Sequence, residues 1–119
     1  MAIVIASDVP LLRSLINMAI QDAGFNVVAE VGSIPELKEI CRGTEVAIVI
    51  LDLHLGDGEF LRTIEDILEI DSEISIIAVT DWLENEAERA LAIGVRAVLQ
   101  KPFSIYDLID MMRKVYPVF

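Results

Sequence analysis

The sequence has 119 residues, of which 55% are hydrophobic, and its formal net charge is −11 at pH 7. A chain of this length suits one domain with its own core, so we expect residues 1–119 to form a single domain. Nine Lys and Arg residues against twenty Asp and Glu argue against a basic surface, and we expect no nucleic-acid binding. Apolar runs fall short of the roughly 20 residues that a membrane helix needs. The apolar N-terminus lacks a basic leader, so we expect a soluble, cytoplasmic protein.

The chain opens with a pattern that predicts a strand, a helix and a second strand. The apolar run AIVIA at 2–6 predicts a buried strand. Pro10 suits the first turn of the helix that follows, and Gly24 suits the position just past its end. NVVAEV at 26–31 predicts the second strand, and the charge of Glu30 favours an edge position in the sheet.

The same alternation continues to the end of the chain. A capping box formed by Ser33 and Glu36 begins the second helix. VAIVIL at 46–51, ISIIAV at 74–79 and VRAVL at 95–99 predict three more strands. Apolar residues three or four apart predict the helices: Leu37 and Ile40, then Ile64, Ile67 and Leu68, then Ala87, Ala90 and Leu91, and finally Leu108, Ile109, Met112 and Val115. The single cysteine, Cys41, shares the spacing of the second helix and is expected in the core.

Five strands alternating with five helices predict an α/β fold in which a parallel sheet has helices on both faces. In such sheets ligands bind beyond the carboxyl ends of the strands. The polar residues that follow the first, third, fourth and fifth strands are Asp8, Asp52, Thr80 and Lys101. We therefore expect these four side chains to meet at one rim of the sheet.

These four residue types suit chemistry on a phosphoryl group. Two carboxylates favour a hard cation such as Mg²⁺, which typically takes one or two protein carboxylates. A lysine ammonium and a threonine hydroxyl can both donate to phosphoryl oxygens. An aspartate can also act as the nucleophile and form an aspartyl-phosphate. Taken alone, however, Asp52 and Asp8 are equally consistent with helix caps.

Four motifs together resemble the receiver domains of response regulators, the CheY-like family, over essentially the whole chain. They are VIASDVPLLR, VILDLHLGDG, IIAVT and ALAIGVRAVLQKPFS. The resemblance implies a five-stranded parallel sheet in the order 2-1-3-4-5. It implies that Asp52 is the phosphoacceptor, that Thr80 supplies the switch hydroxyl and that Lys101 contacts the phosphoryl group. It further implies Mg²⁺ held by Asp8, Asp52 and the backbone carbonyl of His54, and a cis peptide bond before Pro102.

The resemblance also implies partners. A histidine kinase or a phosphotransfer protein would phosphorylate the domain, which would then change its binding to a downstream protein or a fused output domain. The expected switching surface comprises the fourth helix, the fifth strand and the fifth helix, through which a homodimer is also expected. The domain is expected not to be an enzyme, apart from catalysing its own phosphorylation and dephosphorylation.

Three residues depart from the family pattern. Ser7 stands where the family usually has another acid, so Mg²⁺ is expected to bind more weakly. Asp81 follows Thr80 in place of a small residue, and it either faces the pocket or, as we favour, serves as an acid at the start of the fourth helix. Val98 replaces an aromatic residue that is usually coupled to the threonine. These departures favour an alternative, a pseudo-receiver that acts as a phosphorylation-independent protein-interaction module.

Other residues near the predicted site have simpler interpretations. We expect the His54 side chain to be exposed in a loop, and Trp82 either to cover hydrophobic surface or to form a wall of the pocket. The acids Glu84, Glu86 and Glu88 are expected to form a solvated helix face. The loop containing Gly56, Asp57 and Gly58 lacks the usual proline, and its backbone should be freer. A flavodoxin-like cofactor binder is a third hypothesis, weakened because SDVPLLR contains no glycine to cradle a phosphate.

Overall fold

The computed structural model describes residues 1–56, 59–81 and 85–115. Within these ranges the strands are β1 (Ile3–Ala6), β2 (Val27–Val31), β3 (Ile48–Asp52), β4 (Ser75–Thr80) and β5 (Ala97–Gln100). The helices are α1 (Pro10–Asp22), α2 (Ile34–Gly43), α3 (Phe60–Ile70), α4 (Glu86–Ile93) and α5 (Ile105–Val115). All neighbouring strands are parallel, and their order is β2-β1-β3-β4-β5. The predicted fold class and strand order are therefore confirmed.

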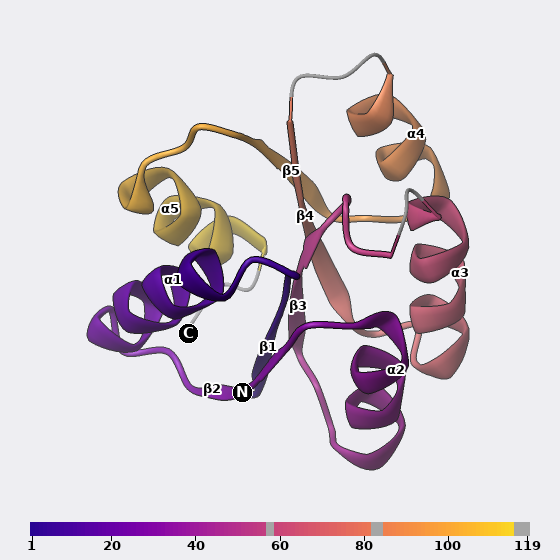
Figure 1. The fold of residues 1–119 in the computed structure, drawn as a ribbon, viewed down its shortest axis with the longest axis horizontal. Helices are drawn as coiled ribbons and strands as arrows, with labels where there is room; N and C mark the ends of the chain where they lie inside the picture. The colour runs from indigo at the N-terminus through magenta and orange to yellow at the C-terminus, as the bar shows by residue number, and fades with distance from the viewer. Residues whose placement is uncertain (57–58, 82–84, 116–119) are drawn as a thin grey trace.

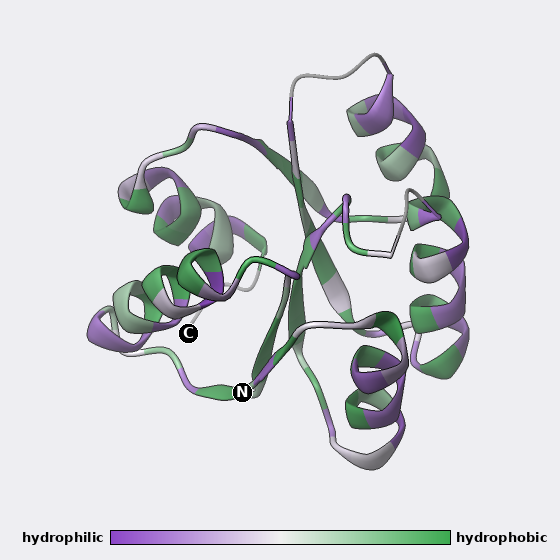
Figure 2. Cartoon of the chain, in the orientation of Figure 1, coloured by the Kyte–Doolittle hydropathy of each residue, from purple (hydrophilic) through white to green (hydrophobic). Residues whose placement is uncertain are grey.

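Helices cover both faces of the sheet. Helices α1 and α5 lie on one face, and α2, α3 and α4 lie on the other (Figure 1). Successive strand residues point to opposite faces, so Ile50 packs with the first group of helices and Leu51 with the second. Figure 2 shows the resulting pattern, in which the central strands are hydrophobic and the helices carry their polar residues outward. Each face of the sheet thus has its own hydrophobic core.

Burial along the strands follows their place in the sheet. Every residue of β1, β3 and β4 is buried, as expected of strands covered on both sides. Strand β2 lies at the edge and exposes Glu30, which confirms the prediction from its charge. Strand β3 begins later than predicted and extends through Asp52, which pairs with Val79 of β4. Asp52 is therefore part of the sheet and does not merely follow it.

Local capping agrees with the sequence signals. Ser33 accepts a hydrogen bond from the backbone N–H of Glu36, which is the first of the two bonds of the predicted capping box. The Glu36 carboxylate accepts from the Ser33 hydroxyl instead of from the Ser33 backbone N–H, so only half of the box is formed. Gly24 and Gly94 follow α1 and α4 with φ values of 94° and 123°, which residues with a side chain rarely adopt. Cys41 is 5% exposed, as expected of a core residue. No helix in the described ranges has the length and hydropathy needed to cross a bilayer.

Candidate functional site

Asp52 is a buried acid with several hydrogen-bond donors around it. It is the last residue of β3 and is 3% exposed. Its Oδ1 accepts a hydrogen bond of 3.0 Å from the backbone N–H of His54. Its Oδ2 accepts from Ser7 Oγ at 3.2 Å and from Lys101 Nζ at 3.1 Å. A buried carboxylate needs such partners, and here two side chains and one backbone N–H supply them.

Lys101 contacts Asp52 from the end of β5, on the far side of β4. It directly follows β5, and its backbone N–H donates to the carbonyl of Thr80 at 2.8 Å, which continues the β4–β5 pairing. The peptide bond between Lys101 and Pro102 is cis, as the family resemblance implies. The Lys101 side chain is 23% exposed. Its ammonium group is therefore in contact with both Asp52 and solvent.

Ser7 approaches Asp52 from the opposite neighbouring strand. It directly follows β1 and is 1% exposed. Its hydroxyl donates to Asp52 and accepts from the backbone N–H of Val9 at 3.1 Å. Arg13 Nη1 donates to the Ser7 carbonyl at 2.6 Å, which holds this end of β1 against α1. The position where the family usually carries an acid is thus a fully hydrogen-bonded neutral residue.

The predicted metal ligands offer only oxygen atoms. Asp8 follows Ser7 and is exposed, while Asp52 is buried and His54 would contribute its backbone carbonyl. Among the residues that the structure describes, no three His, Cys, Asp or Glu side chains form a metal-binding group. Two carboxylates and a carbonyl nevertheless match the ligands that Mg²⁺ takes while keeping several waters. The donor set fits a hard cation, with one formal charge fewer than the family pattern supplies.

Thr80 is buried near Asp52 but directs its hydroxyl elsewhere. Residue Ala78 of the same strand faces the core beneath α2, α3 and α4, and Thr80, two residues on, shares that side of the sheet. Its Oγ1 lies 2.5 Å from Glu86 Oε1 and 2.9 Å from the Asp81 carbonyl oxygen. The structure therefore joins Asp52 and Lys101, as predicted, while the Thr80 hydroxyl is bonded at the start of α4.

Three polar side chains lie beside Thr80, and two of them differ from their predictions. The His54 side chain is 37% exposed, in line with the expected loop position, and its Nε2 lies 3.3 Å from Asp81 Oδ2 and 3.8 Å from Glu86 Oε1. Asp81 is not an acid of the first turn of α4, because that helix begins only at Glu86. The Glu86 side chain is 15% exposed, so it is not part of a solvated face, although Glu88 is exposed as expected. The sequence could not show these contacts, because they join residues of the β3–α3 loop, the end of β4 and the start of α4 that meet only in the folded chain.

The remaining departures from the family pattern have clear positions. Val98 pairs with Ala78 across β4 and β5 and packs, partly buried, against the core beneath α4. Gly56 has a φ of 75°, and a Cβ atom there would lie 2.1 Å from Ile34 Cδ1. The positive φ and this close approach to α2 both favour glycine here, although the end of the Ile34 side chain can move. The expectations for Asp57, Gly58, Trp82 and Glu84 fall outside the described residues.

The chain is similar in sequence and in structure to known receiver domains. Residues 3–113 match the model of the response regulator receiver domain. The chain is 32% identical over 112 residues to the transcriptional regulatory protein PdtaR of Mycobacterium tuberculosis, covering 90% of this chain but only 52% of that protein. It also superposes on a CheX–CheY–BeF3–Mg²⁺ complex from Borrelia burgdorferi, with a TM-score of 0.89, 17% identity, and coverage of 99% of this chain and 90% of the other. A LuxR-family DNA-binding response regulator from Staphylococcus aureus gives a TM-score of 0.87, 25% identity, and coverage of 96% and 97%.

Proposed function

The chain belongs to the family of response regulator receiver domains, and we propose that in two-component signalling its Asp52 accepts a phosphoryl group from a histidine kinase or a phosphotransfer protein. The observation that carries this proposal is the buried Asp52 carboxylate with Lys101 Nζ 3.1 Å from its Oδ2. An ammonium group at this distance can neutralise charge on the transferred oxygens. The domain would catalyse its own phosphorylation and dephosphorylation and act on no soluble substrate beyond the phosphodonor.

The proposed transfer step uses few groups. A carboxylate oxygen of Asp52 forms a bond to phosphorus, and the bond from phosphorus to the donor's imidazole nitrogen breaks, leaving its electron pair on that nitrogen. Lys101 pairs with an oxygen of the transferred group. The Thr80 hydroxyl donates to another oxygen once it has left Glu86. The added negative charge at Asp52 then biases the neighbouring elements between two states.

Mg²⁺ is the cofactor proposed for this step. Asp8, Asp52 and the His54 carbonyl would hold it, because they are the hard oxygen donors at this strand end. When bound, the ion supplies positive charge that stabilises the phosphoryl oxygens in the transition state. The neutral Ser7 hydroxyl at the position of an acid predicts weaker Mg²⁺ binding than an acidic pair would give.

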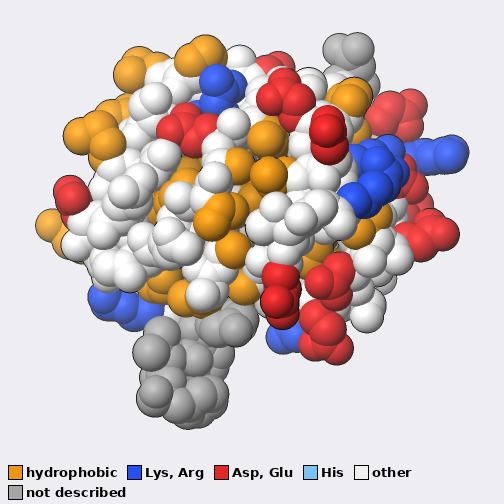
Figure 3. Space-filling model, turned by 90° about the horizontal axis from the view of Figure 1, so that it is seen from below, with side chains coloured by type: hydrophobic (Ala, Val, Ile, Leu, Met, Phe, Trp, Pro, Cys, Tyr) orange, Lys and Arg blue, Asp and Glu red, His pale blue; other side chains and the backbone are white. Residues whose placement is uncertain are grey.

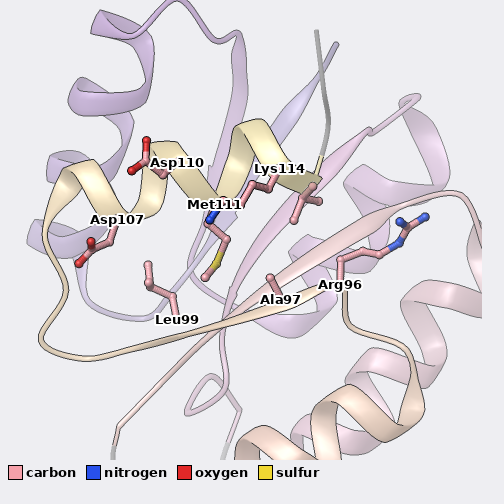
Figure 4. A pocket seen from close by; sticks show the side chains of 8 residues that line it. Arg96, Ala97, Leu99, Asp107, Asp110, Met111 and Lys114 are labelled. Atoms are coloured by element: carbon pink, nitrogen blue, oxygen red, sulfur yellow. The ribbon is translucent and has the colours of Figure 1, made fainter.

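The switching surface proposed for partner binding comprises α4, β5 and α5. A groove of about 590 Å³ lies between β5 and α5, and Figure 4 shows its layout. Asp107 and Asp110 lie toward one end, Arg96 toward the other, and Met111 lies between them (Figure 4). Opposite charges at the two ends suit a partner with the reverse pattern, and a second copy related by a twofold axis provides one. We therefore propose a downstream protein or a homodimer at this surface.

A protein partner fits the charge of the molecule better than nucleic acid does. On the face drawn in Figure 3, Lys and Arg side chains lie in small separate groups among acidic and hydrophobic ones. The formal net charge is −11. Binding of a phosphate backbone depends on clustered positive charge. The DNA-binding named for the Staphylococcus aureus relative is therefore not proposed for this chain.

Phosphorylation is tested directly by intact mass spectrometry after incubation with Mg²⁺ and acetyl phosphate. We expect a single added phosphoryl group that is labile in base and that requires Mg²⁺. The matched control is Asp52→Asn, which keeps the volume of the side chain and removes the nucleophile. An absent adduct, or one that persists undiminished in Asp52→Asn, contradicts the proposal.

The second candidate is a pseudo-receiver that binds its partner without phosphorylation. Two contacts favour it: the Ser7 hydroxyl is bonded to Asp52, and the Thr80 hydroxyl is bonded to Glu86. Both groups are thereby engaged in the unphosphorylated protein. Partner affinity that is unchanged in Asp52→Ala supports this candidate, whereas affinity that depends on phosphorylation removes it.

A further inference from the structure

Glu86 has a contact that the proposed transfer step does not use. It is the first residue of α4, and its side chain is 15% exposed. Its Oε1 lies 2.5 Å from Thr80 Oγ1, so the two groups share a short hydrogen bond. A hydroxyl has one proton to donate, and donation to a carboxylate is stronger than donation to a neutral oxygen. The Thr80 hydroxyl therefore donates its hydrogen bond mainly to Glu86. The Asp81 carbonyl oxygen, at 2.9 Å, is a second acceptor.

The surroundings of Glu86 suit a negative charge. A negative charge is stabilised at the N-terminus of a helix, where backbone N–H groups lack partners. His54 Nε2 lies 3.8 Å from Glu86 Oε1 and approaches from the β3–α3 loop. Asn85, directly before Glu86, has the left-handed backbone conformation with φ of 60°, which asparagine tolerates better than most residues. Glu86 is thus a largely covered acceptor for the Thr80 hydroxyl at the start of α4.

We propose that Glu86 is a positioning residue that holds the Thr80 hydroxyl away from Asp52 and so biases the domain toward its unphosphorylated state. This inference rests on the proposed function, because only a phosphoryl group on Asp52 provides the competing acceptor. Thr80 then exchanges one charged acceptor, Glu86, for another on the modified Asp52. When a hydroxyl has two discrete acceptors, a small change in the strength of either hydrogen bond shifts the balance between the two conformations.

The first measurement needs no phosphorylation. Methyl NMR of the unphosphorylated protein reports the side-chain rotamer of Thr80. We expect one dominant rotamer in the native protein and a shifted, averaged signal in Glu86→Gln, which keeps the side-chain length and removes the charge. The control is Glu88→Gln, an exposed acid in the first turn of the same helix. An unchanged Thr80 signal in Glu86→Gln overturns the proposal, even if Asp52 is phosphorylated normally.

The second measurement is binding of beryllofluoride with Mg²⁺, a mimic of the phosphoryl group. We expect Glu86→Gln to bind it about fivefold more tightly, since a charged hydrogen bond is replaced by a neutral one. Removing a negative charge near the site would by itself also increase the affinity for the anion. Asp81→Asn measures that effect, because the Asp81 carboxylate contacts His54, and Thr80 bonds only to the Asp81 backbone. Equal gains in Asp81→Asn and Glu86→Gln overturn the proposal.

A double-mutant cycle separates the hydrogen bond from other effects of Glu86. In a Thr80→Val background no hydroxyl can be released from Glu86. Glu86→Gln should then increase the affinity for beryllofluoride no more than Asp81→Asn does. An extra gain that survives without the hydroxyl overturns the proposal. If no variant binds beryllofluoride while the Thr80 signal still shifts in Glu86→Gln, the contact stands and the proposed phosphorylation fails instead.

Discussion

Ser7 donates its hydroxyl proton to Asp52 across the ends of two neighbouring strands, at an Oγ to Oδ2 distance of 3.2 Å. Ala6 pairs with Leu51 in the sheet, so the next residue of each strand meets its counterpart at the rim. Both side chains are almost fully buried. A neutral donor thus faces the carboxylate that we propose as the phosphoacceptor, at a position where the sequence comparison led us to expect an acid.

The first prediction concerns Ser7→Asp. Two carboxylates this close repel each other, so we expect the metal-free variant to lose about 1–3 kcal/mol of unfolding free energy. The added charge should tighten Mg²⁺ binding at least about tenfold. Urea unfolding with and without Mg²⁺ measures the first effect, and calorimetric titration measures the second. The control Ser7→Ala removes the hydrogen bond and adds no charge, so it should not bind Mg²⁺ more tightly. Equal Mg²⁺ affinity in Ser7→Asp and the native protein would count against the proposed metal site.

The second prediction concerns Lys101→Met. This change removes the charged partner of a carboxylate that is 3% exposed. We expect a loss of about 2 kcal/mol of unfolding free energy, because Asp52 keeps only neutral donors, together with loss of phosphorylation. Lys101→Arg should recover most of the stability. Lys114→Met, at an exposed position on α5, is the control for the loss of one surface charge; a stability change as small as in that control would show that the pair contributes little.

The third prediction concerns the pH dependence of Cys41. Burial, and secondarily the negative charge of Asp71, raises the pKa of its thiol from 9.0 to about 11. An acid whose pKa is raised on folding binds its proton more tightly in the folded state, so stability falls as pH increases through 9.0 and up to about 11. We expect the unfolding free energy of the native protein to fall more steeply over this range than that of Cys41→Ala. The same thiol should react with iodoacetamide at pH 8 only as fast as the protein unfolds, and rapid modification of the folded protein would contradict its burial.

The fourth prediction concerns Gly56→Ala. Gly56 has φ of 75°, and the added Cβ would lie 2.1 Å from Ile34 Cδ1. We expect the free energy of unfolding to fall by about 2–4 kcal/mol, from backbone strain and overpacking together. Gly24→Ala is the matched control, since Gly24 has φ of 94° but nothing within 4 Å of the added atom, and it should lose only the backbone part, about 1–2 kcal/mol. Combining Gly56→Ala with Ile34→Val, which lacks the clashing Cδ1, should recover part of the difference in urea unfolding; additive losses would show that the clash is not the cause.

Much of the architecture is contained in the sequence. The apolar runs of β1, β3 and β4 predict buried strands because strands covered on both faces of a sheet consist mostly of apolar residues. The charge of Glu30 correctly places β2 at the edge. Asp52 and Lys101 were predicted to meet because the carboxyl ends of parallel strands share one rim, and their 3.1 Å contact confirms it.

The partners of the other rim residues were decided by tertiary structure. Nothing in the local sequence shows that the Thr80 hydroxyl bonds to Glu86, that Asp81 faces His54 or that Ser7 donates to Asp52. Periodicity and strand position depend on which side chains avoid water, and that information is local. The choice of a hydrogen-bond partner depends on ångström-scale distances between loops from different strands, and only the packed sheet and its helices set those distances.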